Sequence, residues 1–518
     1  MAERKVLVIG AGVGGLVAAA LLAARGTDVT VVEAQADPGG KLRAMDVDGA
    51  PIDAGPTVFT LKPLFEEIFA AAGGDLATAL PTRPADILAR HAWGKDRLDL
   101  FADPARSEAA IGDFAGAQAA RGYRAFRAHA RRVFETLDES FLRAGNTNPI
   151  GLSWRIGLGR LPDLLAIRPY ESMWKVLGEF FPDARLRQLF ARYTTYCGSS
   201  PFRAPSTLML ITHVEALGVW LIDGGMHRLA AALEELGRRN GVTFRYGTPV
   251  EAIQVDRGRA SGVTLASGEH IAADAVICNA DPAALAAGRF GTAARKATRG
   301  VPPARRSLSA MVWLSKARAS GFPLDRHNVF FSHDYPAEFA ALHAGRLADD
   351  PTVYVCAQDR GPAAPPPAGP ERMQIIVNAP ATGDAGGFTP QEKDRCGRHM
   401  QAALARAGLS LELDPAATRL LTPAEFETLC PSTGGALYGR ASHGWAASFL
   451  RQSARTRIPG LYCAGGSTHP GAGVPMAALS GRLAAATVQT DLASTHRSYP
   501  AATPGGMSTR PATTSVTA

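Results

Sequence analysis

The sequence predicts an α/β protein in which one parallel-sheet domain is assembled from three separate stretches of chain. The first 33 residues read as a single strand–turn–helix–strand unit, the same alternation returns after residue 224, and a glycine-rich turn at 465–473 precedes a last helix. Segments of mixed helical and strand character are inserted between these pieces. At 518 residues the chain is long enough for two or more domains with large cores.

The composition excludes several classes of protein. Six cysteines without a close CxxC pair argue against a disulfide scaffold and a cysteine-based zinc site, so we expect no metal and a reducing compartment. The net charge of +8 favours anionic partners such as an acidic membrane face. Because no dense run of Lys and Arg is interleaved with aromatic residues, we do not expect nucleic-acid binding.

The first apolar stretch, residues 6–24, resembles a signal peptide or a short membrane span. Glycines at positions 10, 12, 14 and 15 divide it into a β-branched half and an Ala/Leu-rich half, so a strand at 5–9 and a helix at 14–25 fit better. A second strand is expected at 28–32. Since no other run reaches about 18 unbroken apolar residues, we expect a soluble or peripheral protein.

The turn between the first strand and the first helix carries the pattern Gly10-x-Gly12-x-x-Gly15, with Gly14 inside it. Such glycines permit a tight turn, close approach of backbone N–H groups to a pyrophosphate, and close helix–strand packing. The helix start favours an anion, and Glu33 ends the second strand, where an acid accepts hydrogen bonds from a ribose. These residues predict NAD or FAD binding; the alternative is that the glycines serve packing alone.

A second glycine pair, Gly39-Gly40, is followed by Lys41 just past the second strand. It favours FAD, because FAD is longer than its ADP half and needs extra backbone contacts beyond Glu33. We expect Lys41 to face the pyrophosphate or the flavin edge; the alternative is an ordinary turn with a solvated lysine.

The chain divides by composition and periodicity into two interleaved domains. We expect a cofactor-binding domain from residues 1–65, 224–290 and 456–494, and a substrate-binding and membrane-associating domain from 66–223 and 291–455. In the former we expect helices at 226–240 and about 475–490, and strands at 243–246, 250–255, 260–265 and 275–278. The tail, 495–518, is rich in Ser, Thr, Pro and Ala and is expected to be disordered.

Further blocks of sequence are distinctive. Beside residues 10–16, Glu33 and 38–41, they are Asp53-Ala54-Gly55-Pro56-Thr57, residues 223–226 with 250–253, and residues 461–481, which contain Thr-His-Pro-Gly-Ala-Gly-Val-Pro at 468–475. Together they resemble the phytoene desaturase family of bacterial carotenoid desaturases. Residues 39–43, 53–61 and 97–104 make the chain most similar to the 1-hydroxycarotenoid 3,4-desaturases, also called methoxyneurosporene dehydrogenases. Phytoene desaturases more often have Arg where this chain has Lys41.

The resemblance implies a Rossmann-type FAD-binding domain of the flavin amine oxidase and phytoene desaturase kind, with an inserted mixed α+β substrate domain and a helical membrane-facing part. It implies C-3,4 desaturation of an acyclic hydroxylated carotenoid, with hydride transfer to flavin N5. It further implies a cytoplasmic protein held peripherally at the inner face of the membrane, with quinone or oxygen as electron acceptor. The further residues implied to bind FAD are Gly55, Pro56, Thr57, Val250, Gly465, Gly473, Val474, Pro475 and Met476.

Two residues are candidates for catalysis. His469 is of a type suited to proton abstraction near neutral pH, or it fixes its loop by hydrogen bonding. Asp53 either takes part directly or caps a turn beside the cofactor. His213 and Glu215, in an apolar stretch, either reach a substrate hydroxyl or pack in the core. The helix start after Gly473 offers N–H groups to the negative charge of reduced flavin.

Two segments are candidates for membrane contact, since a long polyene does not dissolve in water. Residues 121–137 predict an amphipathic helix with Arg124, Arg127, Arg131 and Arg132 around an apolar stripe of Tyr123, Phe126, Ala130, Val133 and Leu137. The alternative is an ordinary surface helix. Residues 150–167, too polar to span a bilayer, either dip into the interface or form a buried lid.

Three rival functions share parts of this pattern. The desaturase reading includes phytoene desaturation as its own alternative. An amine or protoporphyrinogen oxidase uses the same fold, but we identify no aromatic cage for an amine in a chain with only 7% aromatic residues. A non-catalytic flavin-binding carotenoid carrier is the third, and the full set of cofactor blocks argues against it.

Overall fold

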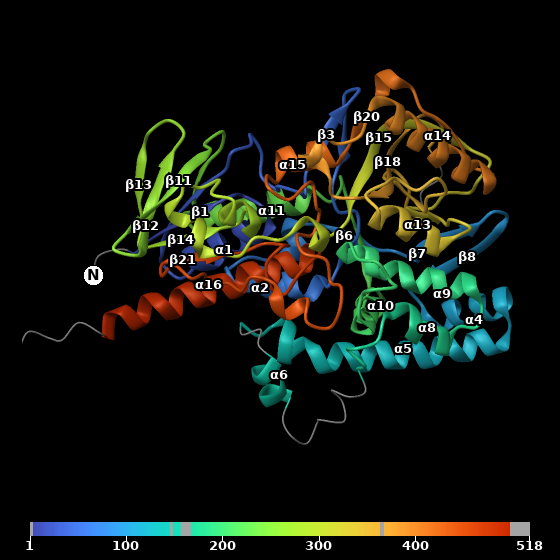
Figure 1. Ribbon diagram of the computed structural model, residues 1–518, viewed down its shortest axis with the longest axis horizontal. Helices are drawn as coiled ribbons and strands as arrows, with labels where there is room; N and C mark the ends of the chain where they lie inside the picture. Colours follow the sequence, from blue (N-terminus) through green and yellow to red (C-terminus); the bar gives the residue numbers. More distant parts are fainter. Residues whose placement is uncertain (1–3, 146–148, 157–166, 363–366, 498–518) are drawn as a thin grey trace, which may run out of the picture.

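A five-stranded parallel sheet joins the three separated segments of chain. The computed structural model describes residues 4–145, 149–156, 167–362 and 367–497 (Figure 1). The strand order is β10-β2-β1-β14-β21, so neighbours in the sheet come from all three segments. The strands are β1 (Lys5–Ile9), β2 (Asp28–Val32), β10 (Thr243–Arg245), β14 (Ala275–Cys278) and β21 (Leu461–Cys463). The first four were expected, whereas β21 was not.

Alternation along β1 explains how this sheet is covered on both faces. Val6 and Val8 belong to the large core beneath the helices, whereas Leu7 and Ile9 pack on the other side, beneath a three-stranded antiparallel sheet. That small sheet is built from β11 (Val250–Asp256), β12 (Arg259–Leu265) and β13 (His270–Ala272). The near-continuous apolar sequence of β1 therefore reflects burial on two faces.

Three helices cover the face of the sheet marked by Val6 and Val8: α1 (Val13–Ala23), α11 (Arg228–Arg239) and α16 (Val474–Arg497). Every residue of α1 is buried, because it packs against both α11 and α16. A Cβ on Gly481 would lie 2.2 Å from the Gly14 carbonyl oxygen, so these two helices cross at a glycine contact. Helix α16 is longer than the expected 475–490 and passes residue 494; the rest of the tail, 498–518, lies outside the described residues.

The two inserted segments share a second, larger sheet of eight strands. Its order is β19-β15-β18-β17-β16-β7-β8, with β20 also paired to β15. Strands β7 (Ile87–Trp93) and β8 (Asp96–Phe101) come from the first insert. The others come from the second: β15 (Ser309–Ser320), β16 (His327–Phe330), β17 (Val353–Ala357), β18 (Glu371–Ala379), β19 (Ser410–Glu412) and β20 (Thr418–Leu421). Helix α14 (Pro390–Arg406) packs on one face, where Cys396 and Met400 join the core.

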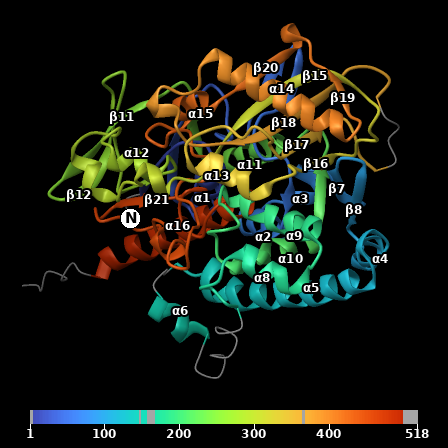
Figure 2. The ribbon, with the colours of Figure 1, turned by 45° about the vertical axis from the view of Figure 1, so that its right-hand side comes forward.

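A layer of helices lies under this sheet (Figure 2). It contains α4 (Pro104–Ala115), α5 (Ala117–Leu137), α8 (Met173–Phe180), α9 (Ala184–Ala191) and α10 (Leu210–Ala216). The remaining α-helices among the described residues are α2 (Lys62–Ala71), α3 (Leu76–Ala79), α6 (Pro149–Ile156), α12 (Pro282–Ala286), α13 (Tyr335–His343) and α15 (Pro423–Leu429). A π-helical turn, η1 (Asp138–Leu142), continues α5, and a 3-10 turn, η3 (Arg192–Cys197), continues α9.

The amphipathic helix expected at 121–137 is confirmed as α5, but the hypothesis that its apolar stripe binds a membrane is wrong. All five stripe residues are buried, and Phe126 makes ring contacts with Phe180, Phe181 and Phe190 at 4.8–5.6 Å. Arg124 and Arg131 are ion-paired with Glu108 and Glu135 on the outer side. The pattern marks a helix whose apolar face completes the core.

The expected boundary at residue 65 does not separate the two regions cleanly. The hairpin of β3 (Ala44–Val47) and β4 (Ala50–Asp53) packs on β15 of the large sheet. Farther on, β5 (Phe59–Thr60) and β6 (Thr82–Pro84) both pair with β9 (Val219–Ile222). This stretch therefore forms the junction between the small and the large sheet.

Within the described residues, no helix has both the length and the apolar character needed to cross a bilayer. The second candidate membrane segment, 150–167, lies largely outside the described residues, since 157–166 are not described. Its first part forms α6, which packs on η1 and lies below α5 in Figure 1.

Candidate active site

The first glycine turn meets the second glycine pair beside the start of α1. Gly12 and Gly39 form an isolated parallel bridge, and Gly39 N donates to Ala11 O at 2.8 Å. No side chain caps the N-terminus of α1 at Gly12, which leaves its first N–H groups for a ligand. The Glu33 carboxylate accepts from Ala11 N at 2.7 Å and from Gln35 N at 2.8 Å, which holds it at this turn.

Asn279, which follows β14, packs into the centre of this arrangement and was not found from the sequence. A Cβ on Gly12 would lie 2.6 Å from Asn279 Nδ2, and one on Gly14 would lie 2.8 Å from both Asn279 Oδ1 and Gly465 N. Gly10 and Gly465 have φ angles of +97° and +116°, which side chains disfavour. A polar residue at the carboxyl end of a buried strand was the available signal.

The middle segment reaches the same place from the other side of Glu33. Glu33 N donates to Arg245 O at 2.9 Å, and Thr248 N donates to Glu33 O at 2.8 Å. Val250, two residues after Thr248, begins β11. We name the first glycine turn, Gly39-Gly40, Glu33, Asn279 and Gly465 the nucleotide cradle. The structure thus brings together the expected Gly10, Gly12, Gly14, Gly15, Glu33, Gly39, Gly40 and Gly465.

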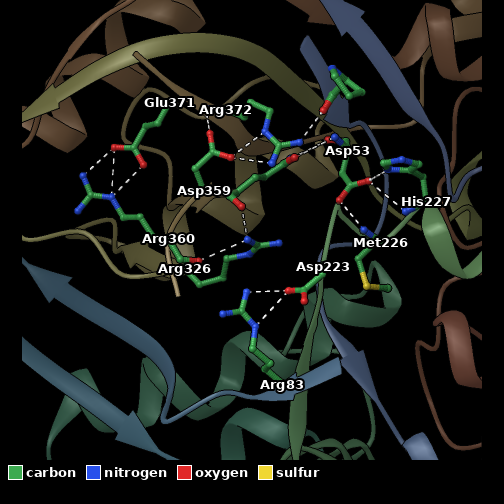
Figure 3. A network of polar contacts seen from close by, with 12 residues as sticks. Asp53, Arg83, Asp223, Met226, His227, Arg326, Asp359, Arg360, Glu371 and Arg372 are labelled. Atoms are coloured by element: carbon green, nitrogen blue, oxygen red, sulfur yellow. Dashed lines mark hydrogen bonds and ion pairs between the residues drawn. The ribbon is translucent and has the colours of Figure 1, made fainter. Parts of the chain in front are cut away.

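Asp53 lies at the junction of the two sheets and is fully engaged there (Figure 3). Its carboxylate, 3% exposed, accepts from Met226 N at 2.6 Å, from His227 N at 3.1 Å and from His227 Nδ1 at 2.8 Å. Its backbone exchanges two hydrogen bonds with the Gln358 amide, at 2.9 and 3.0 Å. These contacts support the turn-capping role for Asp53, which does not line the cavity described next.

A cavity of about 280 Å³ opens beside the nucleotide cradle. Gly55 carries the chain close to Lys41, since a Cβ there would lie 1.8 Å from the Lys41 carbonyl oxygen. The Lys41 ammonium is partly buried and donates to Leu437 O at 2.6 Å, which excludes the solvated-turn reading. Seven of the expected cofactor residues line the cavity: Lys41, Gly55, Pro56, Thr57, Gly473, Val474 and Pro475. Met476 lies one residue farther along α16 and packs against the core.

The start of α16 presents free N–H groups at this cavity. The first hydrogen bond of the helix runs from Ala477 N to Gly473 O at 2.9 Å, so the N–H groups of Val474 and Met476 have no partner inside the helix. Pro475 has no N–H to leave unpaired. An uncapped helix start of this kind stabilises negative charge that lies close to it.

The opposite side of the cavity is formed by side chains from the inserted segments. On β18, Gln374, Ile376 and Asn378 line the cavity, while the alternate residues face α14. We name as the substrate wall the lining residues of η3, α10, α13, β17 and β18. Its apolar members are Ile211, Val214 and Ile376, and its polar members are Arg192, Thr195, Tyr196, Glu215, Tyr335, Tyr354, Gln374 and Asn378.

His469 does not line the cavity. Its ring is 2% exposed, lies 4.9 Å from the Phe141 ring, and its Nε2 is 2.9 Å from Ala144 O. Burial lowers the pKa of His469 to about 4. The geometry therefore supports the loop-fixing role and gives no support to the base role.

His213 and Glu215 do not act as a pair. His213 lies against the Phe134 ring at 5.1 Å and is absent from the cavity lining. Glu215 lines the cavity and accepts hydrogen bonds from Tyr193 Oη at 2.5 Å and Tyr196 Oη at 2.9 Å. Burial raises the pKa of Glu215. Because the two residues are two positions apart on α10, they face in different directions.

The residues present fit a flavin dinucleotide. The uncapped start of α1, the glycines that Asn279 and Gly465 crowd, and Glu33 suit a pyrophosphate and a ribose. The family model of flavin containing amine oxidoreductases matches residues 13–489, so the chain belongs to this family, and its cofactor is FAD. An oxidoreductase from Methanosarcina mazei has the same fold, with a TM-score of 0.58 and 16% identity over 94% of this chain and 100% of that chain.

Curated relatives assign the chain to a narrower group within this family. A hydroxyneurosporene desaturase from Rubrivivax gelatinosus is 52% identical over 514 residues, which cover 99% of this chain and 98% of that protein. A 1-hydroxycarotenoid 3,4-desaturase from Flavobacterium sp. (strain P99-3) is 31% identical over 502 residues, or 93% of this chain and 98% of that protein. The chain is therefore a member of the carotenoid desaturases, oxidoreductases that act on CH–CH bonds.

Proposed function

We propose that this protein desaturates the C-3,4 bond of an acyclic hydroxylated carotenoid such as hydroxyneurosporene. One cavity, bordered on one side by the flavin-binding segments and on the other by the substrate wall, carries this proposal. The similarity to desaturases of hydroxylated carotenoids over nearly the whole chain supports it.

Bound FAD supplies a hydride acceptor, and this chain supplies position and electrostatics. The N–H groups at the start of α16 would stabilise negative charge on the bound flavin. Apolar residues of the wall, among them Ile211, Val214 and Ile376, exclude water and hold an extended hydrocarbon chain. Thr57 joins the two sides, because its Oγ1 lies 2.7 Å from Tyr354 Oη.

Anaerobic mixing of the FAD-loaded protein with 1-hydroxyneurosporene in liposomes tests this function. We expect the blue absorbance band of oxidised flavin to bleach while a carotenoid with a longer conjugated system forms. Phytoene serves as the comparison substrate. Flavin that stays oxidised while the carotenoid binds would point to a carrier, and bleaching by phytoene alone would point to a phytoene desaturase.

We propose further that the protein collects its substrate from the inner membrane face through an aromatic patch of Trp154, Tyr170, Trp445 and Leu450. Their exposed fractions are 85%, 73%, 44% and 55%, high for large apolar side chains. Ring contacts run inward from Tyr170 to Trp445 at 5.5 Å and from Trp445 to Phe449 at 6.2 Å. Phe449 contacts Phe141 of η1 at 5.4 Å, and η1 supports α6, which carries Trp154.

Sedimentation with lipid vesicles tests the aromatic patch. We expect the double variant Trp154→Ser, Leu450→Ser to bind about tenfold more weakly, because two exposed apolar side chains no longer enter the interface. Arg131→Gln on the outer side of α5 is the matched surface control and should bind as the wild type does. Vesicles with and without anionic lipid measure what the net charge of +8 adds. Equal binding of all three proteins would remove the patch from the proposal.

Reoxidation of the cofactor requires an electron acceptor. We propose a membrane-dissolved quinone or oxygen as the acceptor, and the proposed membrane contact of the aromatic patch favours the quinone because it would bring the protein to the bilayer. Turnover in vesicles with quinone under anaerobic conditions, compared with turnover in oxygenated buffer, separates the two.

A further inference from the structure

The substrate wall contains a buried cation that the described chain does not pair with an acid. Arg192 is 8% exposed, lines the cavity, and donates from Nη2 to Tyr196 Oη at 2.9 Å. Its Cζ lies 5.0 Å from the ring centre of Tyr196 and 6.0 Å from that of Tyr354. Among the described residues it forms no ion pair, although Glu215 shares the Tyr196 hydroxyl with it and lies close enough to act on it electrostatically. A buried guanidinium held in this way keeps N–H groups for a ligand in the cavity.

A second polar group on the same wall also lacks a partner. Tyr335 is 3% exposed, lines the cavity, and its Oη has no hydrogen-bond partner among the described residues. Arg192 lies close enough to act electrostatically on Tyr335. A donor and an unpartnered hydroxyl thus line the same cavity, and because buried polar groups of this kind are normally satisfied, they indicate a polar ligand.

The position of these groups agrees with the chemistry of the proposed substrate. In a 1-hydroxycarotenoid only C2 separates the hydroxyl-bearing carbon from C3, so a group that binds the hydroxyl must lie beside the bond that is oxidised. Tyr354, over which Arg192 lies, is hydrogen-bonded to Thr57 of the flavin-binding block. The polar groups are therefore next to the cofactor side of the cavity, as this substrate requires.

We infer that Arg192 and Tyr335 form the specificity site for the C1 hydroxyl of the substrate. Arg192 donates a hydrogen bond to the hydroxyl oxygen, and the substrate hydroxyl donates one to Tyr335 Oη. This inference deepens the proposed function and rests on it. It explains how one wall distinguishes a hydroxylated polyene from the parent hydrocarbon, which would leave both groups unpaired.

Kinetics with a matched pair of substrates, 1-hydroxyneurosporene and neurosporene, test the site in FAD-loaded protein with vesicles. We expect the wild type to have the higher kcat/KM for the hydroxylated compound. Tyr335→Phe should lower that value by about 10- to 100-fold and lower kcat/KM for neurosporene much less, so the preference collapses. Arg192→Lys, which keeps the charge but loses the planar fork, should act in the same direction. Anaerobic binding of 1-hydroxyneurosporene, followed by its absorbance, should weaken in parallel.

Tyr462→Phe is the control, since it removes the hydroxyl of a buried tyrosine on β21, outside the cavity. It should keep the wild-type preference. If the wild type desaturates both compounds equally, or if Tyr335→Phe and Arg192→Lys both retain the preference, the hydroxyl site is refuted while the desaturase function stands. If the wild type converts neither compound, the proposed function itself fails.

Discussion

The nucleotide cradle lies beside the cavity that the substrate wall lines, and the two are built in opposite ways. The cradle is mainly backbone: glycines from the first and last segments come within contact of one another, and Asn279 of the middle segment fills the space between them. The wall consists of side chains that project from η3, α10, α13, β17 and β18. Binding of a common cofactor thus depends on the absence of side chains, whereas recognition of a particular substrate depends on their identity.

The largest expected effect comes from adding a side chain to the cradle. Gly12→Val should abolish FAD retention, because the new Cβ meets Asn279 Nδ2 at 2.6 Å and the side chain occupies the space of the pyrophosphate. The flavin absorbance of purified protein measures this. Gly397→Val in α14, where the nearest atom would be 3.8 Å away, is the control and should keep its flavin. Full flavin content in Gly12→Val would contradict the claim that the cradle binds FAD through the absence of side chains.

A smaller loss is expected at the junction between the two regions. Asp53→Asn removes a carboxylate that accepts three hydrogen bonds from Met226 and His227, and we expect unfolding free energy to fall by about 2–4 kcal/mol. Urea unfolding measures the loss. Once the variant is saturated with FAD, its rate of flavin reduction should stay within a few-fold of the wild type. A loss of several orders of magnitude in that rate would instead make Asp53 catalytic.

The pH dependence of stability sharpens the role of His469. Its pKa falls from an ordinary 6.5 to about 4 in the folded protein, so the unfolded chain binds the proton more tightly. The contribution of the neutral His469 to the free energy of unfolding is complete above pH 6.5 and is lost as the pH falls toward 4. In urea unfolding, the wild type should lose about 2 kcal/mol more than His469→Gln between pH 8 and pH 5. Equal losses would mean that the histidine is not buried in its neutral form.

The smallest effect is expected on the outer side of α5. Arg131→Gln removes an exposed ion pair with Glu135, and such pairs add little to stability. The urea midpoint, flavin content and substrate preference should all match the wild type. A clear change in preference would show that the wall extends to the surface of this helix.

The cradle was predictable because its signals are local. A glycine pattern between a strand and a helix, with an acid at the end of the next strand, determines β1, α1, β2 and Glu33 from adjacent residues. Asn279 was not predicted, because a single polar residue after a strand does not form a recognisable sequence motif. The strand β21 was missed because only three residues pair, and its neighbour in the sheet is almost two hundred residues away.

The wall was predictable only in part, because its members meet through tertiary structure. Glu215 was singled out, but Arg192 and Tyr335 lie on other elements and carry no shared spacing. The stripe on α5 was interpreted as a possible membrane face because burial against a core and insertion into a bilayer produce the same periodicity. The aromatic patch was also not predicted, because Tyr170 and Trp445 are far apart in sequence and meet only in the fold.

The contact between α1 and α16 has a consequence for biosynthesis. The cradle needs Gly465, β21 and the start of α16, which the ribosome makes last, to meet the first glycine turn, which it makes first. A nascent chain therefore has no complete place for the flavin until Gly465 and β21 have been synthesised. Translation products that stop before Gly465 are expected to lack flavin.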